Sequence, residues 1–176
     1  TIVASVIGSV EHDSAPCVAL NYAISMALTG RRTILVEANP FKHTISKLID
    51  INQVDEITHN NINNNYQAST ITLDNKGTAI DYMQCALDNQ FGDDLIESVR
   101  FEALINQLSK DYEIVIISSP SIDTYYPAVE RLNGISNLTF VTIETGKSTK
   151  NNVAKISHLN SPESGLYLIE ISSTNR

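Results

Sequence analysis

Apolar runs rich in valine and isoleucine recur along the chain at the length of β-strands. Several runs are apolar at consecutive positions, which is typical of strands buried on both faces of a parallel sheet. The pattern predicts six strands, at residues 2–8, 33–38, 79–86, 113–118, 138–144 and 166–172. The run at 79–86 is the weakest of them, because aspartate and glutamine interrupt it.

Between these runs, apolar residues return with helical spacing. One helix is predicted at Val18, Ala19, Tyr22, Ala23, Met26 and Ala27, with Gly30 as its C-cap. A second is predicted at Leu95, Ile96, Val99, Leu104, Ile105 and Leu108. The polar, asparagine-rich segment 58–70 predicts a surface loop. Alternating strands and helices predict βαβ units, with helices on both faces of a mostly parallel sheet.

The composition is that of a globular protein, and the charge argues against several partners. With 176 residues, 42% of them hydrophobic, one domain over 1–176 can bury a core without disulfides. A net charge of −8 argues against nucleic acid and anionic membrane surfaces. Cys17 and Cys85 form no CxxC pair, which favours a reducing, cytoplasmic compartment. No run is long enough for a membrane span, and a start at Thr1 suggests a piece of a longer protein.

The candidate chemistry lies where the predicted strands end, because open α/β sheets bind ligands at the carboxyl ends of their strands. The first strand is followed by "GSVEHDSAPCVALNYA", residues 8–23. A phosphate-binding loop there needs glycines, a lysine for the β/γ oxygens and a hydroxyl for magnesium. This stretch contains no lysine and one glycine, so it lacks most of what such a loop requires.

Three segments together carry a resemblance to a known family. They are "IVASVIGS…CVALNYAISMALTGRRTILVEANPFKHTISKLI", "LIESVRFEALINQLSKDYEIVIISSPSI" and "LTFVTIETGKSTKNNV". In this order they resemble the cytoplasmic domain of the bacterial tyrosine kinases (BY-kinases) of exopolysaccharide and capsule assembly, within the deviant-Walker P-loop ATPases. The resemblance spans nearly the whole chain. It implies an α/β fold, a P-loop NTPase-like three-layer sandwich with a mainly parallel central sheet of about seven strands.

The resemblance also places the family's phosphate loop, PGEGKST, on this sequence. Aligned on "VALNYA", it falls on Glu11, His12, Asp13, Ser14, Ala15, Pro16 and Cys17. Ala15 then stands at the lysine position. Pro16 stands at the magnesium-binding Ser/Thr position and offers neither a hydroxyl nor an N–H.

Two further family motifs are altered in the same way. ILVDAD corresponds to "ILVEAN", so its two acids become Glu37 and Asn39. VIIDTP corresponds to "VIISSP", which puts Ser118 in place of a carboxylate, a poor substitute around magnesium. The expectation is a vestigial pocket with no catalytic residue, no nucleotide cofactor and no metal.

Other motifs favour ordinary structural roles. "TGKST" at 145–149 has Val141 where a full phosphate loop needs glycine, so it predicts a helix start capped by Ser148 or Thr149. Cys17 is expected to be a small buried thiol. Spacing among His12, His43, His59 and His158 suggests no zinc site, so these are expected to be solvated or capping. The serines at 118, 119 and 121 lack a nucleophile turn, and partial burial is expected for Tyr125 and Tyr126.

The resemblance and the altered motifs together predict a catalytically inactive, kinase-like domain. It is expected to be an interaction or regulatory module in exopolysaccharide chain-length control and export. The partner implied is a membrane-spanning polysaccharide co-polymerase at the cytoplasmic face of the inner membrane, with a homo-oligomer left open. One alternative is an atypical ATP-binding tyrosine kinase or ATPase whose lysine comes from a neighbouring subunit, Lys42 or Lys147. Another is a scaffold for a different envelope or secretion machine.

Overall fold

A computed structural model describes residues 1–50, 56–58, 62, 68–74, 76–87, 92–159 and 165–172. Its strands are β1 (Ile2–Gly8), β2 (Thr33–Glu37), β3 (Glu56–Ile57), β4 (Ser69–Thr72), β5 (Ala79–Cys85), β6 (Ile114–Ser118), β7 (Leu138–Glu144) and β8 (Gly165–Ile171). Its helices are α1 (Ala15–Leu28), α2 (Ile45–Leu48), α3 (Gly92–Glu97), α4 (Val99–Asp111), α5 (Tyr126–Ile135) and α6 (Lys150–His158). All six predicted strands are confirmed, to within one residue at each end. Most of the predicted loop at 58–70 lies outside the described residues.

The strands form one eight-stranded sheet in the order β3-β5-β2-β6-β1-β7-β8, and β4 pairs with β5 at one side. Every pairing is parallel except that of β4 with β5. This confirms the mainly parallel α/β fold with a central sheet of about seven strands; the described residues form eight. The two additional short strands, β3 and β4, were not predicted because each is too short to show a periodic pattern.

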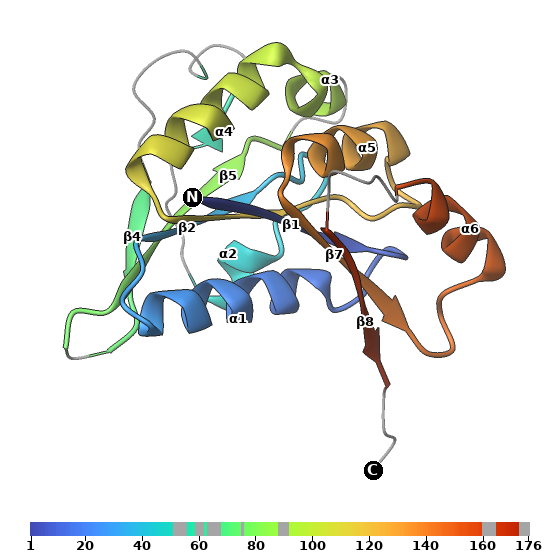
Figure 1. The fold of residues 1–176 in the computed structure, drawn as a ribbon, viewed down its shortest axis with the longest axis horizontal. Helices are drawn as coiled ribbons and strands as arrows, with labels where there is room; N and C mark the ends of the chain where they lie inside the picture. The colour runs from blue at the N-terminus through green and yellow to red at the C-terminus, as the bar shows by residue number, and fades with distance from the viewer. Residues whose placement is uncertain are drawn as a thin grey trace.

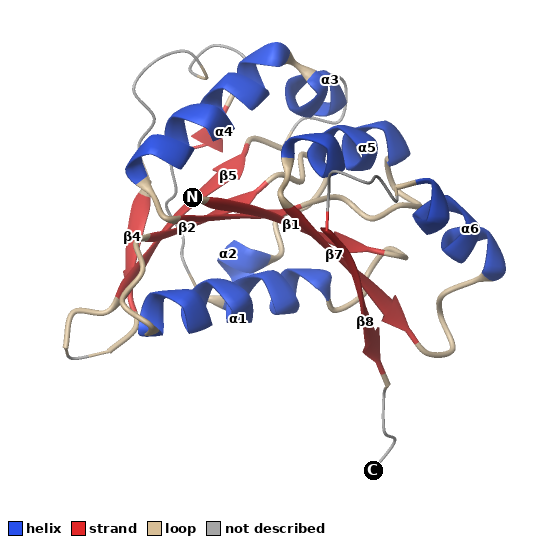
Figure 2. Cartoon of the chain, in the orientation of Figure 1, coloured by secondary structure: helices blue, strands red, loops and turns tan. Residues whose placement is uncertain are grey.

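The helices cover both faces of the sheet, which gives the three layers seen in Figures 1 and 2. α1 and α2 lie on one face, and α3, α4, α5 and α6 lie on the other. β2 and β6, in the middle of the sheet, are buried at every position. Their continuous Val/Ile/Leu runs are therefore explained by helices on both sides.

The first helix packs through alanines. Ala15, Ala19, Ala23 and Ala27 are its buried residues, at a strict four-residue spacing. Small side chains on this face let α1 lie close to the sheet, where it packs against β6 and β2 side chains such as Ile116 and Leu35. The close approach fixes where the loop between β1 and α1 sits.

The second predicted helix is two helices in the structure. Ser98 separates α3 from α4 and is the N-cap of α4, since its backbone is extended and its Oγ accepts the Phe101 N–H at 3.1 Å. Serine is a favoured N-cap residue, and Glu102 lies in the first turn that follows. The apolar spacing continued across this break, so periodicity alone did not reveal it.

Within the described residues, none of the helices combines the length and the apolar character needed to cross a membrane.

Candidate functional site

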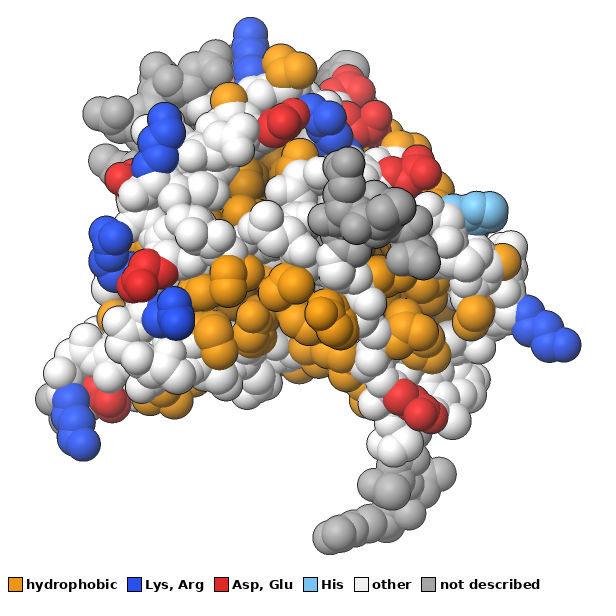
Figure 3. All heavy atoms as spheres, in the orientation of Figure 1, with side chains coloured by type: hydrophobic (Ala, Val, Ile, Leu, Met, Phe, Trp, Pro, Cys, Tyr) orange, Lys and Arg blue, Asp and Glu red, His pale blue; other side chains and the backbone are white. Residues whose placement is uncertain are grey.

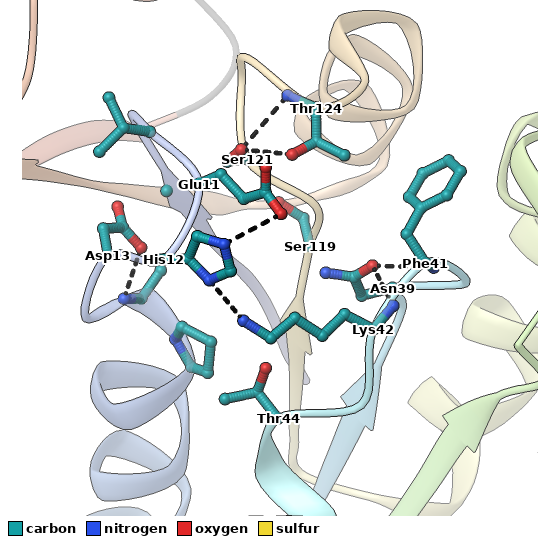
Figure 4. Close-up of a pocket in the computed structure, with 14 residues that line it drawn as sticks. Glu11, His12, Asp13, Asn39, Phe41, Lys42, Thr44, Ser119, Ser121 and Thr124 are labelled. Carbon is teal, nitrogen blue, oxygen red and sulfur yellow. Dashed lines mark hydrogen bonds and ion pairs between the residues drawn. The ribbon is translucent and has the colours of Figure 1, made fainter.

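A small cavity opens at the carboxyl ends of β1, β2 and β6, where ligands bind in open α/β sheets. Its volume is about 60 Å³, against roughly 300 to 1,000 Å³ for typical small-molecule sites. Figure 4 shows its lining residues, which come from the end of β1, the first turn of α1 and the loops that follow the three strands. The lining residues are Gly8, Val10, Glu11, His12, Asp13, Ala15, Pro16, Asn39, Phe41, Lys42, Thr44, Ser119, Ser121 and Thr124.

The carboxyl group of Asp13 is tied into the loop between β1 and α1. Its Oδ1 accepts the backbone N–H of Ala15 at 2.9 Å. Its Oδ2 accepts the hydroxyl of Thr142, on β7, at 2.6 Å. An acidic side chain of the chain itself therefore lies at the N-terminus of α1, the position that helices offer to anions.

The surroundings of Asp13 act on its ionisation in both directions. Burial raises the pKa of the Asp13 carboxyl above its ordinary value, and the negative charge of Glu144 adds to the increase. Hydrogen bonds from Thr142 and from the backbones of Ala15 and Ser9 lower the pKa, without cancelling the effect of burial. Burial thus already disfavours the charged form of Asp13. A second anion beside this carboxyl group is disfavoured for the same reason.

The Asp13 carboxyl group also leaves no room for a side chain at position 8, which is glycine. A Cβ at this position would lie 2.6 Å from Asp13 Oδ1 and 2.7 Å from Oδ2, well inside van der Waals contact. The last residue of β1 and the Asp13 side chain are thus packed directly against each other, which no helical or strand pattern in the sequence reveals.

A chain of polar contacts crosses the mouth of the cavity (Figure 4). Lys42 Nζ lies 2.7 Å from His12 Nδ1, and His12 Nε2 lies 3.4 Å from a Glu11 carboxylate oxygen. An ammonium group can only donate, so Nδ1 of His12 is the acceptor in this arrangement. His12 itself has a positive φ of 61°, which a sharp loop imposes.

Asn39 shapes the loop that carries Lys42. Its Oδ1 accepts the backbone N–H groups of Phe41 at 3.1 Å and of Lys42 at 3.2 Å. This turn holds Lys42 beside the first loop. Of the two lysines considered from sequence, the structure brings Lys42 to the cavity. Lys147 instead pairs with Glu144 at 2.7 Å.

Glu37 and Ser118 are not among the cavity-lining residues. Glu37 is 1% exposed and accepts the N–H groups of Thr44 at 2.6 Å and Ile45 at 2.9 Å. Its other oxygen accepts the Tyr82 hydroxyl at 2.5 Å. Burial, together with the charge of Glu37, raises the pKa of that hydroxyl, so Tyr82 stays a donor. Glu37 connects β2, β5 and the start of α2.

The remaining predicted site residues divide into those near the cavity and those away from it. Glu11, His12, Asp13, Ala15, Pro16 and Asn39 line it, whereas Ser14 and Cys17 do not. The prediction that Cys17 is buried is wrong: its side chain is exposed, because Ala15 and Ala19 occupy the inward face of α1. His43 is also not solvated. It is buried, with Nε2 at 2.7 Å from the Cys85 carbonyl oxygen.

The predicted helix start after "TGKST" is confirmed. Thr149 is the N-cap of α6 and forms a capping box with Asn152. Ser148 instead contacts Ser9, with 2.7 Å between the two hydroxyl oxygens, and Asn152 Nδ2 donates to the Ser9 carbonyl at 2.9 Å. The start of α6 therefore contacts the loop between β1 and α1 and helps to hold it in place. Among the described residues, no group of three or more His, Cys, Asp or Glu side chains is arranged to hold a metal ion.

Several cavity residues were missed from sequence because their signal is only positional. Ser119, Ser121 and Thr124 follow β6, and Phe41 and Thr44 follow β2. The rule that ligands bind at strand carboxyl ends points to these segments, but alignment to the family motifs selected other positions in them. Tyr125 and Tyr126 are half-buried, as predicted, and the Tyr125 ring lies edge-on to Phe41 at 6.2 Å between centroids.

Comparison with known proteins gives matches in structure only. No family model matches the sequence, and none of the curated proteins does so significantly. The kinase domain of the Escherichia coli tyrosine kinase ETK superposes with a TM-score of 0.81 at 12% identity, over 99% of this chain and 69% of that one. The VpsO kinase domain gives 0.79 at 16% identity, over 97% and 85%. A ParA family ATPase from Chlorobium tepidum gives 0.75 at 14%, over 100% and 76%.

The chain therefore has the fold of these kinase domains and of the ParA family ATPase, an α/β P-loop NTPase-like fold. The fold expected from the sequence resemblance is thereby confirmed. In a P-loop fold the loop between the first strand and the first helix is the phosphate loop. Here that loop contains Asp13, whose carboxyl group is bonded to Ala15 and Thr142.

The contacts of Glu37 predict that removing a single hydroxyl group will lower the stability of the chain. Tyr82→Phe removes the hydroxyl that Glu37 accepts in a buried position, so it should lower the free energy of unfolding by about 1–3 kcal/mol. Urea denaturation measures this. Tyr167→Phe, at a residue that is 52% exposed, is the matched control and should have little effect. Equal effects of the two substitutions would contradict a structural role for the Glu37 cluster.

The contact between Gly8 and Asp13 predicts a coupling between the two positions. Gly8→Ala should destabilise the chain by about 1–3 kcal/mol, because the new methyl displaces a carboxyl group held by two hydrogen bonds. In an Asp13→Ala background the same substitution should cost less by about 1 kcal/mol or more. Gly134→Ala, where a Cβ meets nothing within 4 Å, is the control. Additive effects of Gly8→Ala and Asp13→Ala in urea denaturation would refute the contact.

Proposed function

We propose that this chain is a non-catalytic, kinase-like domain that acts as an interaction or regulatory module in exopolysaccharide chain-length control and export. The observation that carries the proposal is the carboxyl group of Asp13 at the N-terminus of α1, bonded to Ala15 and Thr142. A carboxyl group of the protein takes the place in which a P-loop receives a phosphate. The link to polysaccharide export comes from the BY-kinase resemblance in the sequence, and the VpsO kinase domain supports the kinase-like fold.

The residues around the cavity do not fit a magnesium nucleotide. The loop between β1 and α1 offers two acids and no lysine, and Pro16 in the first turn has no N–H. Two like charges about 4 Å apart at an effective dielectric near 20 repel by roughly 4 kcal/mol, on the order of a thousandfold in affinity. The cavity of about 60 Å³ is also several times smaller than ordinary ligand sites.

One observation favours the alternative of an ATP-binding enzyme. Lys42 lines the cavity and reaches the first loop, so it is a cation in the region where a P-loop lysine acts. Its ammonium group contacts His12, which in turn lies 3.4 Å from a Glu11 carboxylate oxygen. We therefore favour the non-catalytic function, with the partner being a membrane-spanning polysaccharide co-polymerase at the cytoplasmic face of the inner membrane.

Nucleotide titration distinguishes the two functions. Isothermal titration calorimetry of the 176-residue chain with ATP and with ADP, each with and without magnesium, should show no binding at micromolar concentrations. The physical reasons are the Asp13 carboxyl group and the missing lysine. Micromolar, magnesium-dependent binding that Lys42→Ala abolishes would establish the enzyme alternative and sink the proposal.

The module role is tested in the source organism. Deleting the gene should change the chain-length distribution of the exported polysaccharide, measured by size-exclusion chromatography of the extracted polymer. A Lys42→Ala copy should restore the normal distribution, because the role requires no nucleotide at the cavity. An unchanged distribution after deletion would place the protein outside polysaccharide export, in agreement with a scaffold for another machine.

A further inference from the structure

Within the part of the chain that the structure describes, no further strand pairs with the outer side of β8. Strand β8 stands last in the strand order and pairs in parallel with β7 through seven successive residue pairs. Tyr167 is 52% exposed and Leu168 is 57% exposed, although they point to opposite faces of the sheet. Natural edge strands are usually blunted by lysine, proline or a bulge. Residues 165–171 contain no lysine or proline, and the register with β7 is unbroken.

The backbone bonds of β8 show which of its groups face outward. The Gly165 N–H donates to the Asn137 carbonyl, and the Ile171 carbonyl accepts the Thr145 N–H. Since a residue's N–H and C=O point to the same side of its strand and alternate along it, residues 165, 167, 169 and 171 face β7. The residues whose N–H and C=O face away from the sheet are Leu166, Leu168 and Glu170.

The three outward-facing residues are placed symmetrically about Leu168. A second β8 running antiparallel can therefore pair with the first so that Leu168 meets Leu168, and Leu166 meets Glu170. Each is then a hydrogen-bonded pair of an antiparallel ladder, in which two residues exchange both N–H···O bonds. This register satisfies the outward N–H and C=O groups of all three residues in both copies.

The surface next to β8 is apolar and uncharged. A groove of about 410 Å³ lies between α1 and the β7–β8 pair, with Val18, Tyr22, Phe140 and Ile169 among its walls. α1 has no charged residue in its 14 positions, and β8 has only Glu170. Figure 3 shows hydrophobic side chains gathered in the lower middle of the view, over the region where Figure 1 places α1, β7 and β8. The exposed positions Cys17, Asn21 and Ser25 of α1 are uncharged as well.

We propose that two copies of this chain associate through antiparallel pairing of their β8 strands about a two-fold axis at Leu168. A second β8 fits this edge, because in reverse direction the same strand pairs each outward-facing N–H and C=O of both copies, as isologous contact about a two-fold axis requires. Tyr167 of one copy then lies opposite Ile169 of the other, so the apolar floor of the groove continues into the second copy. Chains that each carry a charge of −8 repel least where their facing surfaces are uncharged.

Two substitutions at Leu168 test the interface without disturbing the single chain. Leu168→Pro removes an N–H that faces away from β7, so the β7–β8 ladder is kept and the pairing of two copies is blocked. Leu168→Lys places two cations at the two-fold axis. In sedimentation equilibrium, the wild-type chain should be a dimer, and both variants should raise the dissociation constant at least about tenfold. Val153→Lys, on α6 and 49% exposed, is the matched control and should remain dimeric.

A cross-link tests the register. In a Cys17→Ser background, which removes the exposed thiol, Leu168→Cys should form an intermolecular disulfide on mild oxidation, because directly opposed residues lie about 5.5 Å apart at Cα. Val153→Cys should not. A monomeric wild-type chain, a dimer that keeps its affinity in Leu168→Pro with unchanged thermal unfolding, or a dimer without the cross-link at position 168 would each overturn the proposal. A dimer with the cross-link that Leu168→Pro weakens would support it.

Discussion

The candidate site depends on the hydrogen bonds that the Asp13 carboxyl group accepts from Ala15 and Thr142. This carboxyl group joins three elements of the fold, because its partners lie at the start of α1 and on β7 while Gly8, the last residue of β1, packs beneath it. A loop between a strand and a helix N-terminus leaves backbone N–H groups without partners. In this chain the loop supplies its own acceptor. The need for glycine at position 8 follows from that one side chain.

The helix α1 links this site to the edge of the sheet. Its alanine face packs on the central strands, which holds the first loop at the carboxyl ends of β1 and β6. Its opposite face lacks charge and borders the groove beside β8. α1 therefore borders two surfaces. Its alanines pack closely on the sheet, and its opposite side, which carries no charge, borders the groove beside β8.

Much of the fold was predictable from local patterns, and much of the site was not. The continuous apolar runs gave the six longer strands, because burial on both faces leaves a strong signal. β3 and β4 and the break at Ser98 escaped, since two to four residues or one capping serine barely change a periodic pattern. Of the residues aligned to the family motifs, Glu11, His12, Asp13, Ala15, Pro16 and Asn39 line the cavity, and Ser14, Cys17, Glu37 and Ser118 do not. Alignment to a motif says which residue occupies a position and not where its side chain points.

The sequence by itself determined the alternation of strands and helices, the parallel sheet, the capped start of α6 and a first loop without lysine. Each of these depends on residues that are close together in the chain. Tertiary structure decided the rest: Thr142 reaches Asp13 across 129 residues, Tyr82 reaches Glu37 across 45, and Lys42 reaches His12 across 30. Such contacts form only after the sheet has brought distant segments together, so no local pattern of residues specifies them.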